Sequence, residues 1–153
     1  MTNCTFCDII AGHAPATIIY EDDTAIAFMD IKPINPGHLL IIPRTHATYL
    51  SDMDEATGAP LFAIAMRLAA AVRRSGLRCE GVDLFLADGE AAGQEVFHVH
   101  LHVIPRFRDD GFGFRFGPEY RVRSRSELDE AGARIQAALN RGAEVQGGRG
   151  TKE

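Results

Sequence analysis

The stretch Phe97-His98-Val99-His100-Leu101-His102-Val103-Ile104 alternates three histidines with apolar residues. This period of two is typical of a β-strand with one buried face. It predicts that the intervening apolar side chains point into a core, whereas His98, His100 and His102 share the opposite face. Packing alone does not favour three imidazoles, because each needs a hydrogen-bond partner when buried. A purely exposed strand face more often carries Thr, Lys or Glu. The stretch therefore indicates a functional site on a strand.

Size and composition predict one soluble globular domain. The chain has 153 residues, of which 46% are hydrophobic, and this is enough for a sizeable core. No apolar run approaches the ~18 residues of a membrane span, and the first residues lack the features of a signal peptide. We therefore expect a cytoplasmic protein without a membrane partner. A net charge of -5 argues against nucleic acid as a partner.

Arginines gather after the histidines and reverse the local charge. They are Arg106, Arg108, Arg115, Arg121, Arg123 and Arg125, against Asp109, Asp110 and Glu119. Such a run can attract an anionic small molecule, although a solvated basic loop is the commoner meaning.

The remaining patterns predict an α+β domain with an antiparallel sheet. Strands are expected over 17–20, 24–30, 38–42 and 82–87, and one helical turn over 6–11. An apolar stripe from Leu61 to Val72 predicts a helix that ends before Gly76, with Gly58 and Pro60 at its start. Ser126-x-x-Asp129 indicates the cap of a short C-terminal helix. We expect the domain to occupy 1–142 and a disordered tail to follow over 143–153.

Two of the three cysteines form the motif Cys4-x-x-Cys7. This motif is half of a tetrahedral zinc site or a redox pair. A redox pair normally opens a helix after a strand, and no strand precedes Cys4. Zinc is therefore favoured if two more ligands exist, while Cys79 is expected to be a small, partly buried residue.

The histidine stretch by itself does not suit a three-histidine metal site. Side chains at i and i+2 of a strand lie about 7 Å apart, and those at i and i+4 about 13 Å apart, whereas zinc–nitrogen bonds are about 2 Å long. A neutral imidazole is instead a good nucleophile near pH 7. His100, flanked on both sides, is best placed to attack phosphorus. Backbone N–H groups of 93–96 and the Gln94 amide are candidate donors to a phosphoryl group.

These residues resemble the histidine triad family of nucleotide-binding proteins. The resemblance rests on Gly93-Gln94-x-Val96-x-His98-x-His100-x-His102, and it extends to 23–30, Asn35-Pro36-Gly37-His38 and Ile42-Pro43-x-x-His46. Cys4-x-x-Cys7 resembles the start of many bacterial members. The resemblance covers about residues 4–108 and implies a five-stranded antiparallel sheet with a long helix and a short C-terminal helix.

The family resemblance implies a purine nucleoside phosphate that is attacked at its α-phosphorus by His100. Water would then cleave the nucleotidyl-histidine. The His98 carbonyl would orient His100, and His102 would contact phosphate and help to protonate the leaving group. The implied substrate-binding residues are Phe28, Asp30, Ile31, His38, Gln94, Val96 and His102, although core packing explains Phe28 and Ile31 equally well.

The expected substrates are nucleoside phosphoramidates or dinucleoside polyphosphates, and the expected activity is hydrolysis. There are two alternatives. The protein is a nucleotidyltransferase or phosphorylase, or it is a nucleotide-binding module with little turnover. Relatives are commonly homodimers. Two departures bear on rate and leaving group: Ala87 stands where many members have Asn, and Glu95 stands where some have Ser.

The resemblance also implies a zinc site formed by Cys4, Cys7, His46 and His98. A closed Cys2His2 site is structural, so no cofactor is expected to take part in the chemistry. An empty site, with His46 as a surface residue, is the alternative.

Overall fold

The computed structural model describes residues 4–147, which form two units, one ending at Phe112 and the other beginning at Gly113. The elements of the first unit are α1 (Thr5–Ile10), β1 (Ile18–Glu21), β2 (Ala25–Met29), β3 (Leu39–Pro43), the 3-10 turn η1 (Leu50–Asp52), α2 (Glu55–Arg74), β4 (Gly81–Phe85), the 3-10 turn η2 (Glu90–Ala92) and β5 (Leu101–Arg106). The strands form one antiparallel sheet in the order β1-β2-β3-β5-β4. The predicted α+β class, with a five-stranded antiparallel sheet and a long helix, is confirmed.

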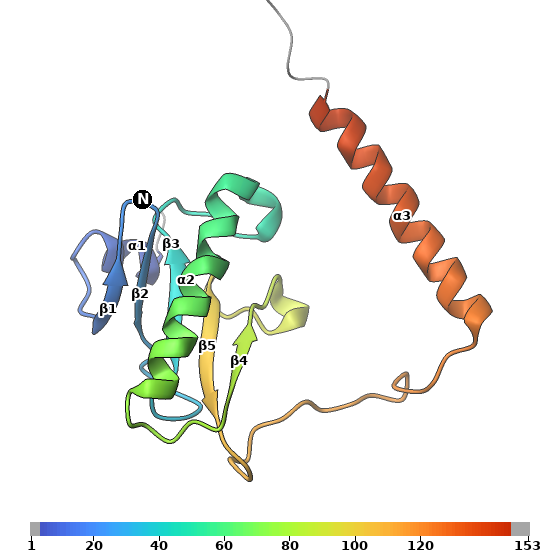
Figure 1. The fold of residues 1–153 in the computed structure, drawn as a ribbon. Helices are drawn as coiled ribbons and strands as arrows, with labels where there is room; N and C mark the ends of the chain where they lie inside the picture. The colour runs from blue at the N-terminus through green and yellow to red at the C-terminus, as the bar shows by residue number, and fades with distance from the viewer. Residues whose placement is uncertain (1–3, 148–153) are drawn as a thin grey trace, which may run out of the picture. The chain divides into compact units, whose positions relative to one another are not determined.

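The strands β2 and β3 are buried on both sides, because α2 packs on one face of the sheet and α1 packs against the other face at these strands (Figure 1). Ala25 and Ala27 pack with α2 in one cluster, whereas Ile26 and Phe28 pack with α1 in another. This alternation follows from the period of two along a strand. The second cluster, which holds Cys4 and Phe6, lies on the face that carries the site.

The helix α2 begins earlier than its apolar stripe indicates. Asp54 is its N-cap and accepts a hydrogen bond from the Thr57 N–H at 2.8 Å. Pro60 therefore lies inside the helix rather than at its start, which corrects the prediction. By length and composition α2 is also the one helix within 4–147 that could cross a membrane. Leu61, Ile64 and Leu68 bury its apolar face against the sheet, as in the core helix of a globular domain.

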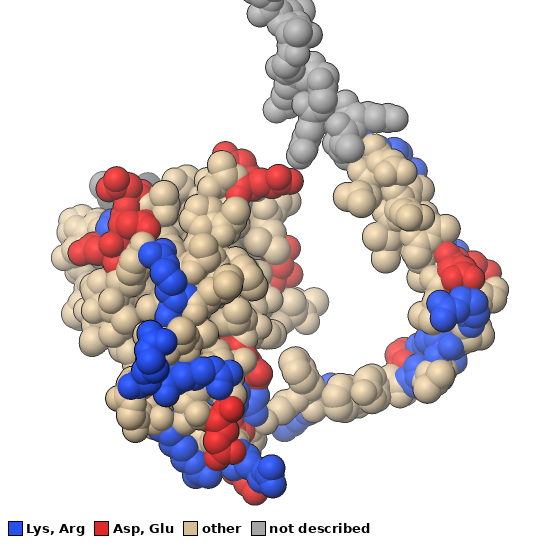
Figure 2. Space-filling model, in the orientation of Figure 1, with Lys and Arg blue, Asp and Glu red and all other residues tan. Residues whose placement is uncertain are grey.

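Charges follow the direction of α2. Glu55 lies in its first turn, and Arg73 and Arg74 lie in its last. In Figure 2, lysine and arginine side chains gather over the C-terminal half of the helix and the turn after it. Acidic groups at the start of a helix and basic groups at its end are favourable because they oppose its dipole.

The strand that carries the triad is shorter than its sequence pattern predicts. β5 begins at Leu101, so His102 lies in the strand but His98 and His100 lie in the segment before it. There the Val99 N–H donates to the Ala47 carbonyl at 2.7 Å instead of to a strand. The three imidazoles still lie close together, as the alternation predicts: the ring centroids of His100 and His102 are 4.9 Å apart, and Phe6 contacts both His98 and His100.

The second unit contains α3 (Arg125–Gly147), a helix of 23 residues rather than the short helix expected. Its cap lies two residues before the predicted position. Ser124 Oγ accepts from the Glu127 N–H at 3.2 Å, and Glu127 Oε2 accepts from the Ser124 N–H at 2.8 Å. The helix includes residues 143–147 of the expected tail, and 148–153 lie outside the described residues.

Candidate active site and metal centre

His100 is buried, and its two ring nitrogens have different roles. Nδ1 lies 2.7 Å from the carbonyl oxygen of His98. Because a carbonyl can only accept, Nδ1 carries the hydrogen and Nε2 keeps its lone pair. The backbone of the triad itself thus fixes His100 in the tautomer that a nucleophile needs.

A chain of hydrogen bonds fixes the tautomer of His102 as well. The Ile34 N–H donates to His38 Nδ1 at 3.1 Å, so the hydrogen of neutral His38 lies on Nε2. His38 Nε2 is 2.8 Å from His102 Nδ1 and donates to it. The remaining nitrogen of His102, Nε2, therefore carries a hydrogen. One backbone amide in the turn before β3 in this way sets two imidazoles.

The imidazoles of His38 and His102 are neutral near pH 7. Burial, reinforced by the neighbouring imidazoles of His100 and His38, lowers the pKa of His102 to about 4, while Asp30 opposes this effect. Burial also lowers the pKa of His38, again against Asp30, whose Oδ2 lies 3.6 Å from His38 Nε2. The Nε2–H of His102 is consequently available as a neutral hydrogen-bond donor.

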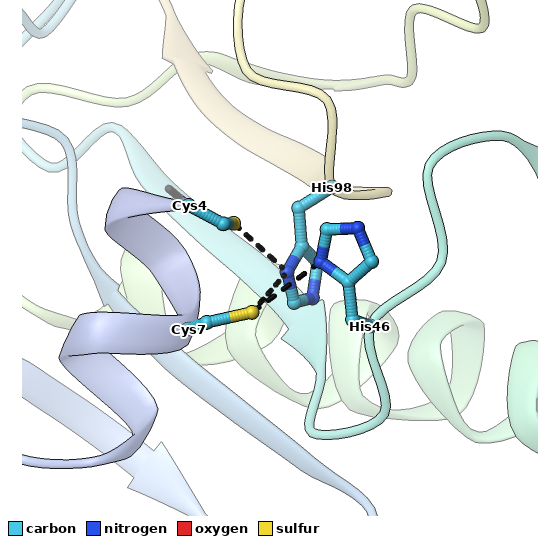
Figure 3. Close-up of side chains that lie close together, drawn as sticks. All are labelled: Cys4, Cys7, His46 and His98. Atoms are coloured by element: carbon cyan, nitrogen blue, oxygen red, sulfur yellow. Dashed lines mark hydrogen bonds between the residues drawn. The ribbon is translucent and has the colours of Figure 1, made fainter. Parts of the chain in front are cut away.

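The four residues expected to bind zinc come together in space (Figure 3). One ligand atom from each of Cys4, Cys7, His46 and His98 lies within 4.8 Å of the others. Both thiols come from the start of the chain, His46 from the loop after β3, and His98 from the segment before β5.

The geometry of this cluster fits a tetrahedral zinc ion. His98 Nε2 donates to the Pro43 carbonyl at 2.9 Å, so Nδ1 is free to bind metal. That nitrogen lies 3.6 Å from Cys4 Sγ and 3.7 Å from Cys7 Sγ, and His46 Nδ1 lies 3.3 Å from Cys7 Sγ. Zinc bonds of about 2.0–2.3 Å place tetrahedral ligand atoms roughly 3.3–3.8 Å apart. The Pro43 carbonyl orients His98 in the way that outer partners of metal ligands do.

Gln94 has a different environment from the one expected of a phosphate ligand. Its side chain is buried, and Oε1 accepts from the Gly89 N–H at 2.7 Å. Nε2 donates to the carbonyls of Thr48 at 2.8 Å and Val96 at 3.2 Å. The amide therefore shapes the loop. Within the described chain, the backbone N–H groups of Glu95 and Val96 have no protein acceptor.

The other expected contacts divide between core and surface. Phe28 is buried, and Val96 packs against the same cluster, whereas Ile31 is 92% exposed. His38 is buried and faces His102 rather than an open pocket. Ala87, which replaces the asparagine of many members, is buried and offers no donor.

Two contributors to the site were not expected from the sequence. Phe6 packs against His100, and the Ile34 amide binds His38. Phe6 could have been found from the sequence, because it lies between the two cysteines of the Cys4-x-x-Cys7 motif. The role of the Ile34 backbone amide could not, because a backbone group leaves no mark in the sequence.

Comparison with known proteins gives consistent matches. A family model described as the HIT domain matches residues 11–109. An uncharacterized HIT-like protein of Borreliella burgdorferi is 42% identical over 118 residues, which are 76% of this chain and 85% of that protein.

Solved structures agree with these sequence matches. A Zn-bound histidine triad family protein from Mycobacterium smegmatis has a TM-score of 0.70 and 40% identity, with 94% of this chain and 97% of that chain covered. A histidine triad nucleotide-binding protein from Candida albicans has a TM-score of 0.78 and 26% identity, with 91% and 99% covered. The triad, the fold and these matches together show that the chain belongs to the histidine triad (HIT) family.

Proposed function

We propose that the protein hydrolyses purine nucleoside phosphoramidates or dinucleoside polyphosphates at the α-phosphorus through a nucleotidyl-histidine on His100. The observation that carries the proposal is the bond from Nδ1 to the His98 carbonyl, which leaves Nε2 as the nucleophile. The Candida albicans relative, described as nucleotide-binding, supports a nucleotide as substrate.

In the first step the lone pair of His100 Nε2 forms a bond to phosphorus. The bond from phosphorus to the leaving atom breaks, and that atom keeps the electron pair and takes up a proton from water. His102 donates its Nε2–H to a phosphoryl oxygen, and the free N–H groups of Glu95 and Val96 are further donors. In the second step water attacks phosphorus and loses a proton to the hydroxide left by the first step, and the nitrogen–phosphorus bond breaks with its electron pair returning to Nε2, which restores neutral His100.

The remaining site residues receive roles around this centre. Asp30 accepts hydrogen bonds from the ribose, and Phe28, Ile31 and Val96 contact the base and sugar. His38 orients His102. Gln94 holds the loop that presents the backbone donors, and His98 orients His100 through its carbonyl.

The test is a reaction with an adenosine phosphoramidate labelled in the nucleotide, stopped with alkaline denaturant because phosphorus–nitrogen bonds hydrolyse in acid. Parent protein should accumulate label on histidine and release AMP, whereas His100→Ala should do neither. His13→Ala, which removes an exposed histidine outside the site, is the matched control and should behave like the parent. Absence of both adduct and AMP with the parent would favour the binding module. Release of ADP when phosphate is added would favour the phosphorylase.

We further propose that Cys4, Cys7, His46 and His98 bind a structural zinc ion, which supplies rigidity rather than chemistry. The bound zinc of the Mycobacterium smegmatis relative supports this. Metal analysis should find about one zinc per chain. Chelation or Cys7→Ser should lower Tm, because metal binding is coupled to folding. Cys79→Ser, which changes the remaining thiol, should leave zinc content unchanged.

A homodimer is the proposed assembly. β4 is an edge strand, and it exposes Leu84 and Phe85. Beside it an apolar hollow is lined by residues that include Met53, Phe62 and Leu86. An edge strand next to an apolar surface suits pairing with a second copy. Light scattering after gel filtration should give twice the chain mass, and Phe62→Glu should reduce the measured mass.

The proposed location is the cytoplasm, because cysteines that bind metal must stay reduced.

A further inference from the structure

Phe6 lies between the two cysteines of the metal cluster and contacts the proposed nucleophile. Its ring centroid is 5.3 Å from that of His100, and the two rings are nearly perpendicular at 82°. It also meets His98 at 5.9 Å and Phe28 at 5.4 Å. Phe6 is only 7% exposed, so these contacts are part of the core.

The contact with Phe6 limits the rotation of His100. One hydrogen bond, from Nδ1 to the His98 carbonyl, does not hold the imidazole by itself, because rotation about the side-chain bonds can break it. An aromatic ring against its edge or face removes that freedom. Phe6 itself is held firmly, because it is buried in the cluster under β2 and β3.

We propose that Phe6 is a positioning residue for His100, which it holds in the attacking orientation. This inference rests on the proposed function above. It assigns to the short helix α1 a role in catalysis in addition to its supply of thiols.

The experiment compares Phe6→Leu with Phe6→Tyr and with Ile9→Ala. Leucine keeps an apolar side chain without the ring, and tyrosine restores the ring. Ile9 packs on the same cluster but is aliphatic, so its loss reports simple destabilisation. Single-turnover rates of adduct formation at saturating phosphoramidate should fall about tenfold in Phe6→Leu, with KM within about twofold. Phe6→Tyr should recover most of the rate, and Ile9→Ala should lower Tm without lowering the rate.

A second readout does not require turnover. In spectra of nitrogen-15-labelled histidine, parent protein should show His100 as one tautomer with hydrogen on Nδ1, and Phe6→Leu should show both tautomers averaged. A higher KM at an unchanged rate, or an unchanged tautomer, would overturn the proposal and make Phe6 a wall of the binding pocket. If the parent forms no adduct, the proposed function fails, and the tautomer spectra still decide whether Phe6 positions His100.

Discussion

Acid should destabilise this protein through His102. The side chain has a reference pKa near 6.5 in the unfolded chain, and its pKa falls to about 4 in the fold because of burial and the neighbouring imidazoles of His100 and His38. As pH falls from 6.5, the unfolded state therefore takes up a proton that the folded state refuses. Stability decreases over this range and is restored as pH rises. The expected loss is about 2 kcal/mol at pH 5 and about 3 kcal/mol below pH 4.

The matched variant is His102→Asn, whose side-chain oxygen can still accept from His38 Nε2 but does not titrate. Urea unfolding followed by circular dichroism should be measured for both proteins at pH 7.5, 6 and 5. Asp30, His38, His100 and the metal ligands are the same in both, so their contributions largely cancel. The parent should lose about 2 kcal/mol more than the variant between pH 7.5 and 5. Identical losses would refute the assigned environment of His102.

Other substitutions test the frame around the site. Gly37 has φ of +93°, and a Cβ there would lie 2.8 Å from Leu77 Cδ1 and 3.1 Å from Pro105 Cγ. Gly37→Ala should cost about 2–3 kcal/mol in urea unfolding, and a neutral result would mean that the turn before His38 relaxes freely. Asp54→Ala should cost about 1 kcal/mol by removing the cap of α2, whereas Asp54→Ser should recover most of it. The buried Asp110 carboxylate accepts from Arg106 Nε at 2.6 Å and Asn35 Nδ2 at 2.8 Å. Asp110→Ala should cost more in urea unfolding than the removal of an exposed ion pair does, and a loss no larger than that would contradict the burial of the carboxylate.

Local patterns predicted the sheet well because its strands obey one simple rule. Ala25 to Met29 and Leu39 to Pro43 are apolar throughout, as strands covered on both faces must be. The four zinc-site side chains were also foreseen by resemblance, and they come together in the structure. Periodicity failed for α2, where Asp54 rather than the first apolar residue determines the start. It failed for α3 because an exposed helix needs no apolar stripe along its full length.

The alternating histidines were misread as a continuous strand for a physical reason. Alternation of apolar and polar residues reports which side chains are buried, but it does not report which backbone pairs with which. β3 pairs with β5 at Leu39 to Ile41, opposite Leu101 to Val103, and no farther. Before Leu101 the partner is instead the segment that follows β3, and an extended chain bound to a loop shows the same alternation as one bound to a strand.

Residues 43–48, which are the last residue of β3 and the segment after it, contact several parts of the site. The Pro43 carbonyl accepts from His98, and the Ala47 and Thr48 carbonyls accept from the Val99 N–H and the Gln94 amide. His46, in the same segment, faces Cys7. Three backbone carbonyls thus hold His98, the segment that leads into His100, and the loop that contains Gln94. A backbone carbonyl is present whatever the side chain, so the sequence of 43–48 does not indicate which carbonyls accept hydrogen bonds. Only Pro43 and His46 stood out in this segment, because they belong to the family motif. Substitutions on the triad side of these bonds, such as Gln94→Ala, therefore disturb the site more than changes at Ala47 or Thr48 that leave the carbonyls in place.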